Sequence, residues 1–110
     1  MKTLKELTLL YFDAFRDADL VSLKSFFAEE VRLQDWSKDA HGIESVIAEY
    51  SNIFEALQNI IIDILNLYED NRTVVVELVI SAKGELPIKV VDILTFNEDQ
   101  KISFIRAYKR

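Results

Sequence analysis

The chain has no cysteine, one proline, two glycines and one histidine among its 110 residues. Without cysteine there is no disulfide framework, no thiolate nucleophile and no sulfur-ligated zinc site. The lone histidine, His41, has only Asp39 close to it in sequence, which is a poor ligand set, so we expect no metal and no cofactor. So little glycine and proline excludes a linker or low-complexity segment. Residues 1–110 are therefore expected to form one domain.

Basic residues are also scarce. Thirteen Lys and Arg stand against nineteen Asp and Glu, which gives a formal net charge of -6. Nucleic-acid binders usually gather basic residues on one face, and no such cluster is seen in the sequence, so we expect no nucleic-acid partner. No uncharged apolar run approaches the roughly 20 residues that span a bilayer. We therefore expect a cytoplasmic protein with no membrane partner.

Helical periodicity occupies the first half of the chain. Thr3 and Glu6 have capping-box spacing at the start of a first helix, Asp19 can cap a shorter second helix, and Gly42 leads into a third. The apolar stripes of these helices are Leu4, Leu7, Tyr11, Ala14 and Phe15, then Leu20, Leu23, Phe26 and Phe27, then Ile43, Val46, Ile47, Tyr50 and Phe54.

The second half has the two-residue period of strands. Alternating runs at 60–68, 73–83, 86–96 and 102–108 are joined by short segments of turn-forming residues, which predicts an antiparallel meander. An earlier run at 31–35 predicts one more strand, and 36–41 is expected to be a loop. Helices followed by strands predict an α+β fold, with the helices packed on one face of a curved sheet.

The strand predicted at 86–96 carries a carboxylate on its apolar face. Asp92 is in phase with the members of that face, which are Leu86, Ile88, Val90, Leu94 and Phe96. A buried carboxylate must be ion-paired, hydrogen-bonded or protonated. The sequence leaves open an ion pair with Arg32 or Arg106, or a protonated acid that donates a hydrogen bond.

A second inward carboxylate, Asp35, ends the strand at 31–35. It is either an acid that only starts the following loop or a catalytic base, and Tyr11 is either a packing residue or a hydrogen-bond donor. Removing a proton next to a carbonyl needs a base near the carbon and donors near the oxygen. Asp35 fits the ionised base because it lies beside a loop, and Asp92 and Tyr11 fit the donors.

The order of elements and two motifs resemble a known family. The motifs are Val-Val-Asp-Ile-Leu-Thr-Phe at 90–96 and Ile-Arg-Ala-Tyr at 105–108. Together they resemble the SnoaL-like branch of the nuclear transport factor 2 (NTF2) superfamily, which includes the ketosteroid isomerases. The resemblance implies an NTF2-like, or cystatin-like, cone in which three N-terminal helices pack on a curved, mainly antiparallel sheet.

The same resemblance implies roles for individual residues. Tyr11 and Asp92 match the oxyanion hole, Asp35 matches the residue that moves the proton, and Tyr50 matches a tyrosine that supports the first one. Phe27 stands where some members have another tyrosine. The expected substrate-binding residues are Trp36, Tyr50, Phe27, Phe54, Val90 and Leu94.

These residues leave two kinds of function open. One is a cofactor-free isomerase, dehydratase or cyclase that acts on a small apolar carbonyl compound. The other is a non-catalytic module of the same fold that binds a small ligand or dimerises. A strand pattern that is apolar on both faces also predicts a homodimer through the outer sheet face, where Val91, Ile93 and Ile105 are expected.

Overall fold

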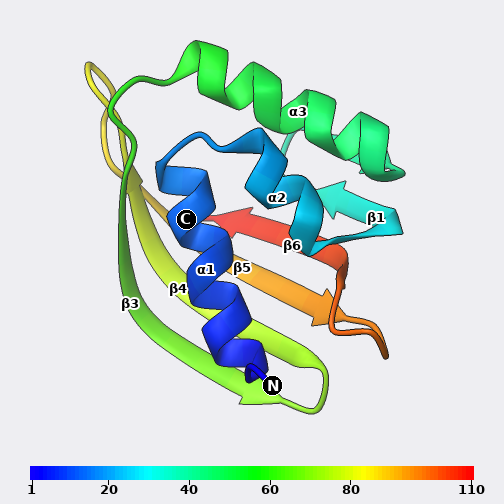
Figure 1. Cartoon of the computed structure of the whole chain (residues 1–110). Helices are drawn as coiled ribbons and strands as arrows, with labels where there is room; N and C mark the ends of the chain where they lie inside the picture. The colour runs from blue at the N-terminus through cyan, green and yellow to red at the C-terminus, as the bar shows by residue number, and fades with distance from the viewer.

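The computed structural model describes residues 1–110 and has three helices on one face of a six-stranded sheet (Figure 1). The predicted α+β class is confirmed. The helices are α1 (Leu4–Arg16), α2 (Leu20–Phe26) and α3 (Ile43–Ala56). The strands are β1 (Phe27–Gln34), β2 (Asp39–His41), β3 (Ile61–Asp70), β4 (Thr73–Ser81), β5 (Ile88–Phe96) and β6 (Ile102–Lys109).

The helices begin where the sequence predicts. The Thr3 hydroxyl accepts a hydrogen bond from the Glu6 N–H at 3.1 Å, and the Glu6 carboxylate accepts one from the Thr3 N–H at 2.9 Å. Asp19 accepts one from the Ser22 N–H at 3.1 Å. Gly42 precedes α3 with a φ of +89°, a conformation that strains any residue with a Cβ.

The strand order is β2-β1-β6-β5-β4-β3. The predicted antiparallel meander is confirmed for β3 to β6, whereas β1 pairs with β6 in parallel. The prediction of a loop at 36–41 is wrong at its end, because Asp39–His41 forms β2 and pairs with β1. Ala40 is buried opposite Leu33, and Asp39 binds the Arg32 guanidinium at 2.8 and 2.9 Å.

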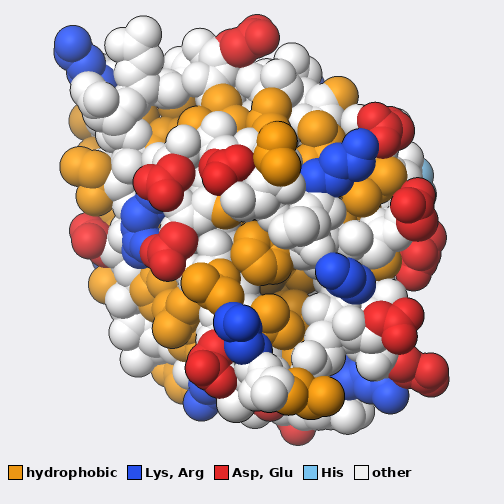
Figure 2. Space-filling view, in the orientation of Figure 1, with side chains coloured by type: hydrophobic (Ala, Val, Ile, Leu, Met, Phe, Trp, Pro, Cys, Tyr) orange, Lys and Arg blue, Asp and Glu red, His pale blue; other side chains and the backbone are white.

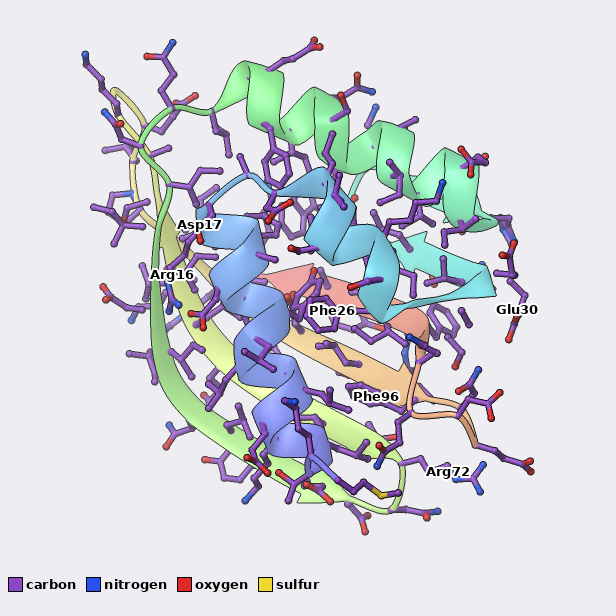
Figure 3. The ribbon with its side chains drawn as sticks, in the orientation of Figure 1. Arg16, Asp17, Phe26, Glu30, Arg72 and Phe96 are labelled. Atoms are coloured by element: carbon purple, nitrogen blue, oxygen red, sulfur yellow. The ribbon has the colours of Figure 1, made fainter.

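The sheet curves around the helices. In Figure 1, β3 and β4 bend around α1, and α3 crosses above α2. A bulge at Leu65 interrupts the pairing of β3 with β4 and helps that strand to bend. Figure 3 shows Arg16 at the end of α1 beside β3, where its guanidinium donates to the Ile62 carbonyl at 2.9 Å. This bond ties α1 to the curved edge of the sheet.

Two sequence predictions about strand faces are wrong. The strand predicted from Leu86 begins at Ile88, and the Leu86 side chain is 85% exposed, because the turn through Gly84 extends to Pro87, which has no N–H for the ladder. Ile105 is 1% exposed and lies on the inner face opposite Leu94. An irregularity in the β5–β6 register between Ile102 and Phe104 puts Ile102 and Ile105 on the same face, which a strict two-residue period cannot do.

The outer face of the sheet keeps the other predicted apolar residues. Val91 and Ile93 are half-buried there, in register with Tyr108 and Arg106 of β6. On the helical side, Figure 2 shows acidic and basic side chains interspersed, with hydrophobic side chains visible between them. None of the helices combines the length and apolar character needed to cross a bilayer.

Candidate active site

A chamber of about 70 Å³ lies between α1, α3 and the inner face of the sheet. Most of its wall is hydrophobic. Its side-chain oxygens belong to the Tyr11 and Tyr50 hydroxyls and to the carboxyl groups of Asp35 and Asp92, which are the only acidic residues in the wall. The fold thus collects the four polar residues singled out by the sequence from α1, α3, β5 and the end of β1.

Asp92 lies inside β5 between Val76 of β4 and Ala107 of β6, and is 7% exposed. Burial among apolar neighbours raises its pKa to about 7, and the nearby charge of Asp35 acts in the same direction. No protein group donates a hydrogen bond to its carboxyl group. Asp92 is therefore largely a neutral acid below pH 7.

The alternative of an ion pair at Asp92 is wrong. Arg32 is held by Asp39 on β2. Arg106 is in register with Ile93, and Ile93 and Asp92 point to opposite faces of the sheet. Neither guanidinium is available to the chamber, so the Asp92 carboxyl group has no ion-pair partner and is free to exchange hydrogen bonds with a ligand that enters the chamber.

The Tyr11 and Tyr50 hydroxyls hydrogen-bond to each other across the contact between α1 and α3. Both side chains are buried, at 1% and 2% exposure, and burial raises the pKa of each phenol. Both phenols are therefore neutral over the physiological range. When Tyr50 donates the bond, the proton of Tyr11 is free to face the chamber.

Asp35 directly follows β1 and is half-buried at the chamber mouth. Its Oδ1 accepts hydrogen bonds from the Ser37 N–H at 2.8 Å, the Lys38 N–H at 2.7 Å and the Ser37 hydroxyl at 3.3 Å. Its own N–H donates to the Lys38 carbonyl at 2.9 Å, which closes the turn. These bonds fix the carboxylate through Oδ1 and leave Oδ2 without a protein donor.

A wider vestibule of about 320 Å³ leads from the chamber to the surface and shares part of its wall, including Asp35 and Trp36. Lys38 and Glu49 lie on the vestibule and form an ion pair of 3.7 Å. The Lys109 ammonium lies 5.2 Å from the centre of the Trp36 ring, within the range of a cation–π contact. Trp36 is thus held at the entrance.

A SnoaL-like domain model matches residues 9–105, which is most of the chain. The chain belongs to the SnoaL-like family. A search of curated protein sequences finds no match.

Solved structures agree with this fold. An NTF2-like protein of unknown function from Cytophaga hutchinsonii is 14% identical, with a TM-score of 0.85 over 100% of this chain and 92% of that one. A candidate polyketide cyclase from Sinorhizobium meliloti is 17% identical, with a TM-score of 0.84 over 93% of each chain. A candidate ketosteroid isomerase from Kribbella flavida is 16% identical, with a TM-score of 0.85 over 97% of this chain and 77% of that one.

The SnoaL-like fold places the predicted substrate-binding residues in two groups. Trp36, Tyr50 and Val90 line the chamber, but Phe27, Phe54 and Leu94 line neither the chamber nor the vestibule. Phe27 packs behind the tyrosines, with its ring 5.7 Å from that of Tyr50, and Phe54 packs 5.5 Å from Phe15. Leu94 is fully buried between Val74 and Ile105 in the neighbouring strands.

Several wall residues were not found from the sequence. Phe15 is a member of the apolar stripe of α1, Ile53 lies beside the stripe of α3, and Ile80 lies near the end of β4. Ala107 is the more informative case, because a small side chain directly beside Asp92 leaves space in front of the carboxyl group. Helical period and strand alternation can mark such residues as inward but cannot separate a cavity wall from the core.

The polar side chains of the chamber suit hydrogen bonding to the oxygen of an organic ligand better than binding of a metal ion. No group of three or more His, Cys, Asp or Glu side chains is placed to hold a metal. The chamber instead offers two hydroxyl groups, one neutral acid and one carboxylate in an apolar wall.

Proposed function

We propose that the chamber is the active site of a cofactor-independent enzyme that moves a proton next to the carbonyl of a small, largely apolar compound. The observation that carries the proposal is Asp92, a buried acid with a raised pKa and no protein partner, in one chamber with Tyr11 and Asp35. A structural acid would be expected to have a donor or an ion pair.

The proposed reaction needs only groups that face the chamber. Asp35 takes a proton from the carbon next to the carbonyl, and the electrons of the broken C–H bond form the C=C bond of an enolate. The negative charge moves to the oxygen, where Tyr11 and protonated Asp92 donate hydrogen bonds within a largely apolar wall. Asp35 then returns the proton to the same or another carbon of the conjugated system.

The dimensions of the cavity limit the substrate. A water molecule occupies about 30 Å³ in the liquid, so a chamber of about 70 Å³ admits only the reacting end of a ligand. The rest of the ligand would lie in the vestibule, near Trp36 and Ile53. The cyclase and isomerase names of two structural neighbours are compatible with enolate chemistry of this kind.

Exchange of a carbonyl α-proton tests the proposal directly. Cyclopentanone in D₂O would be incubated with the wild-type protein and with Asp35→Asn, and deuterium uptake followed by NMR. We expect wild-type catalysis and a loss by a factor on the order of 10² to 10⁴ in Asp35→Asn. The amide oxygen of Asn can still accept the bonds from Ser37 and Lys38, so the variant should stay folded and bind the ketone.

The narrow chamber is also compatible with a second function, in which the protein binds a small ligand without converting it. A stable wild-type protein that binds cyclopentanone and a set of larger enolisable ketones but exchanges none of their protons would reject the enzyme in favour of this module. Equal exchange by the wild type and Asp35→Asn would remove Asp35 from its role.

A further inference from the structure

A groove of about 470 Å³ lies where β5 begins and β6 ends, and is lined by Pro87, Ile88 and three cationic residues, Lys89, Lys109 and Arg110. Strand pairing brings these cations together from distant parts of the sequence. Val90 pairs with Lys109, and the Arg110 N–H donates to the Lys89 carbonyl at 3.0 Å. The groove contains no acidic residue.

The charge of this groove is unusual for the chain. The protein carries a formal net charge of -6, yet the groove holds three of its thirteen Lys and Arg. All three side chains are exposed, and none forms an ion pair within the protein. Glu77 lines the adjacent groove, but its Oε1 accepts bonds from Asn66 at 3.1 Å and Tyr68 at 3.3 Å. Asp35 lines a further pocket with Lys109 but forms no ion pair with it, so the three cations can bind an anion from outside.

The cationic groove adjoins the chamber entrance. Ile88 lines both the groove and the vestibule. Lys109 lines the groove and also contacts the ring of Trp36, which forms part of the chamber wall. A ligand that extends from the chamber past Trp36 therefore comes close to Lys109.

We propose that this groove binds the anionic end, a carboxylate or phosphate, of the same substrate whose carbonyl enters the chamber. The proposal rests on the function proposed above and specifies its substrate class. The Asp35 carboxylate at the chamber mouth repels an anion, while Lys89, Lys109 and Arg110 attract it outside. The two regions together orient a chain-like molecule with its carbonyl end inward.

A pair of ligands that differ only in charge tests the groove. 7-Oxooctanoate and its methyl ester share the ketone and the chain, and α-proton exchange leaves both compounds intact, so the wild-type protein can be titrated with each by NMR. We expect the acid to bind about three- to tenfold more tightly than the ester. This advantage should shrink as salt rises from 50 to 500 mM.

Two double variants that each remove two positive charges are compared. Lys89→Gln/Arg110→Gln is the groove variant, and Lys2→Gln/Lys5→Gln is the control. Lys2 contacts Gln100 in the turn between β5 and β6, at the opposite end of both strands from the groove. We expect the groove variant to lose the preference for the acid with unchanged ester binding, and the control to keep it. Lys109 is left in place because it also holds Trp36.

Equal binding of acid and ester by the wild type, or a preference that survives Lys89→Gln/Arg110→Gln, would overturn the groove proposal. Deuterium exchange tests the proposed function, and it is measured separately from ligand binding, which tests the groove. Exchange of both ligands without preference for the acid supports the proposed function and rejects the groove. A salt-sensitive preference for the acid without any exchange supports the groove as a ligand site and rejects catalysis.

Discussion

Asp35 and Asp92 line the same chamber, but the protein gives hydrogen-bond donors to only one of them. The Asp35 carboxylate accepts three bonds from Ser37 and Lys38, and the Asp92 carboxyl group accepts none. Burial and the charge of Asp35 both favour the protonated form of Asp92. The two acids are therefore suited to opposite tasks, and this difference can be measured.

The first prediction concerns stability against pH. The folded protein holds the Asp92 proton with a pKa of about 7 against a usual value of 3.8, so between these values it binds more protons than the unfolded chain. Wild-type stability should therefore fall as pH rises from about 4 to 7, by roughly 4 kcal/mol at about 1.4 kcal/mol per pH unit. Asp92→Asn carries no such charge and should be the more stable protein at pH 8.5.

Thermal unfolding of both proteins at pH 4.5 and pH 8.5 checks this. The difference between them should be small at pH 4.5, where Asp92 is neutral, which controls for other titrating groups. A melting temperature of Asp92→Asn well below wild type at pH 8.5 would mean that ionised Asp92 has a stabilising partner.

The second prediction concerns Asp92 as a donor. Asp92→Asn still offers an N–H to an oxyanion, whereas Asp92→Ala offers nothing, so kcat/KM for proton exchange should fall less with Asn than with Ala. The loss with Ala should be on the order of 10². Wild-type exchange should also decline above pH 7 as Asp92 ionises, and Asp92→Asn should lack this decline. Similar pH profiles for both proteins would exclude Asp92 as the ionising donor.

The third prediction concerns the buried tyrosine pair. Tyr11→Phe or Tyr50→Phe leaves the other hydroxyl buried without its partner, which should cost about 1–3 kcal/mol of unfolding free energy. Tyr11→Phe/Tyr50→Phe removes both polar groups and should cost less than the sum of the single changes. Urea unfolding of the four proteins measures this coupling, and strictly additive losses would contradict it. Exchange should fall more in Tyr11→Phe than in Tyr50→Phe.

The fourth prediction is a homodimer through the outer sheet face. The half-buried Val91 and Ile93 lie there, and the Nε of Arg106 on the same face is buried without a partner. Glu77 lies in register with Val91 and can supply the opposite charge from a second copy. Light scattering at micromolar concentration should give about twice the chain mass of 12.8 kDa.

Two single substitutions locate the predicted interface. Ile93→Lys places a cation beside Arg106 in the apolar face and should give a monomer. Val21→Lys makes a similar change at an 84% exposed position of α2 and should leave the dimer intact. A wild-type protein that scatters only as a 12.8 kDa species would reject the dimer.

Local signals in the sequence predicted much of this fold. The three helices start at Thr3, Asp19 and Gly42, and each start depends on a residue type that can be recognised locally in the sequence. Short connections likewise set the order of β3 to β6 in the sheet. The parallel pairing of β1 with β6 joins distant segments, and β2 is only three residues long. Neither a pairing between distant segments nor a three-residue strand produces a periodic pattern in the sequence, so neither feature could be predicted from it.

The candidate site was also predicted only in part from the sequence. Alternation marked Asp92 as inward, and the chamber indeed lies in front of it. Sequence patterns could not show that Phe27 and Leu94 pack behind the chamber wall. How deeply a side chain is buried depends on the residues that other helices and strands place around it. Ile105 was placed on the wrong face because an irregularity in pairing changes which residues share a face. The cations of the groove at Lys89 and Lys109 are neighbours only through β5–β6 pairing.

The parallel pairing of β1 with β6 also governs the order in which the protein can fold. β1 has only the short β2 as a local partner, so its place in the sheet waits for β6, which is the last strand in the chain. Pairing segments so far apart in sequence is a slow step in folding. During synthesis, Asp35 and Asp92 would therefore come together only after β6 has left the ribosome, so the chamber is not assembled in a partly made chain.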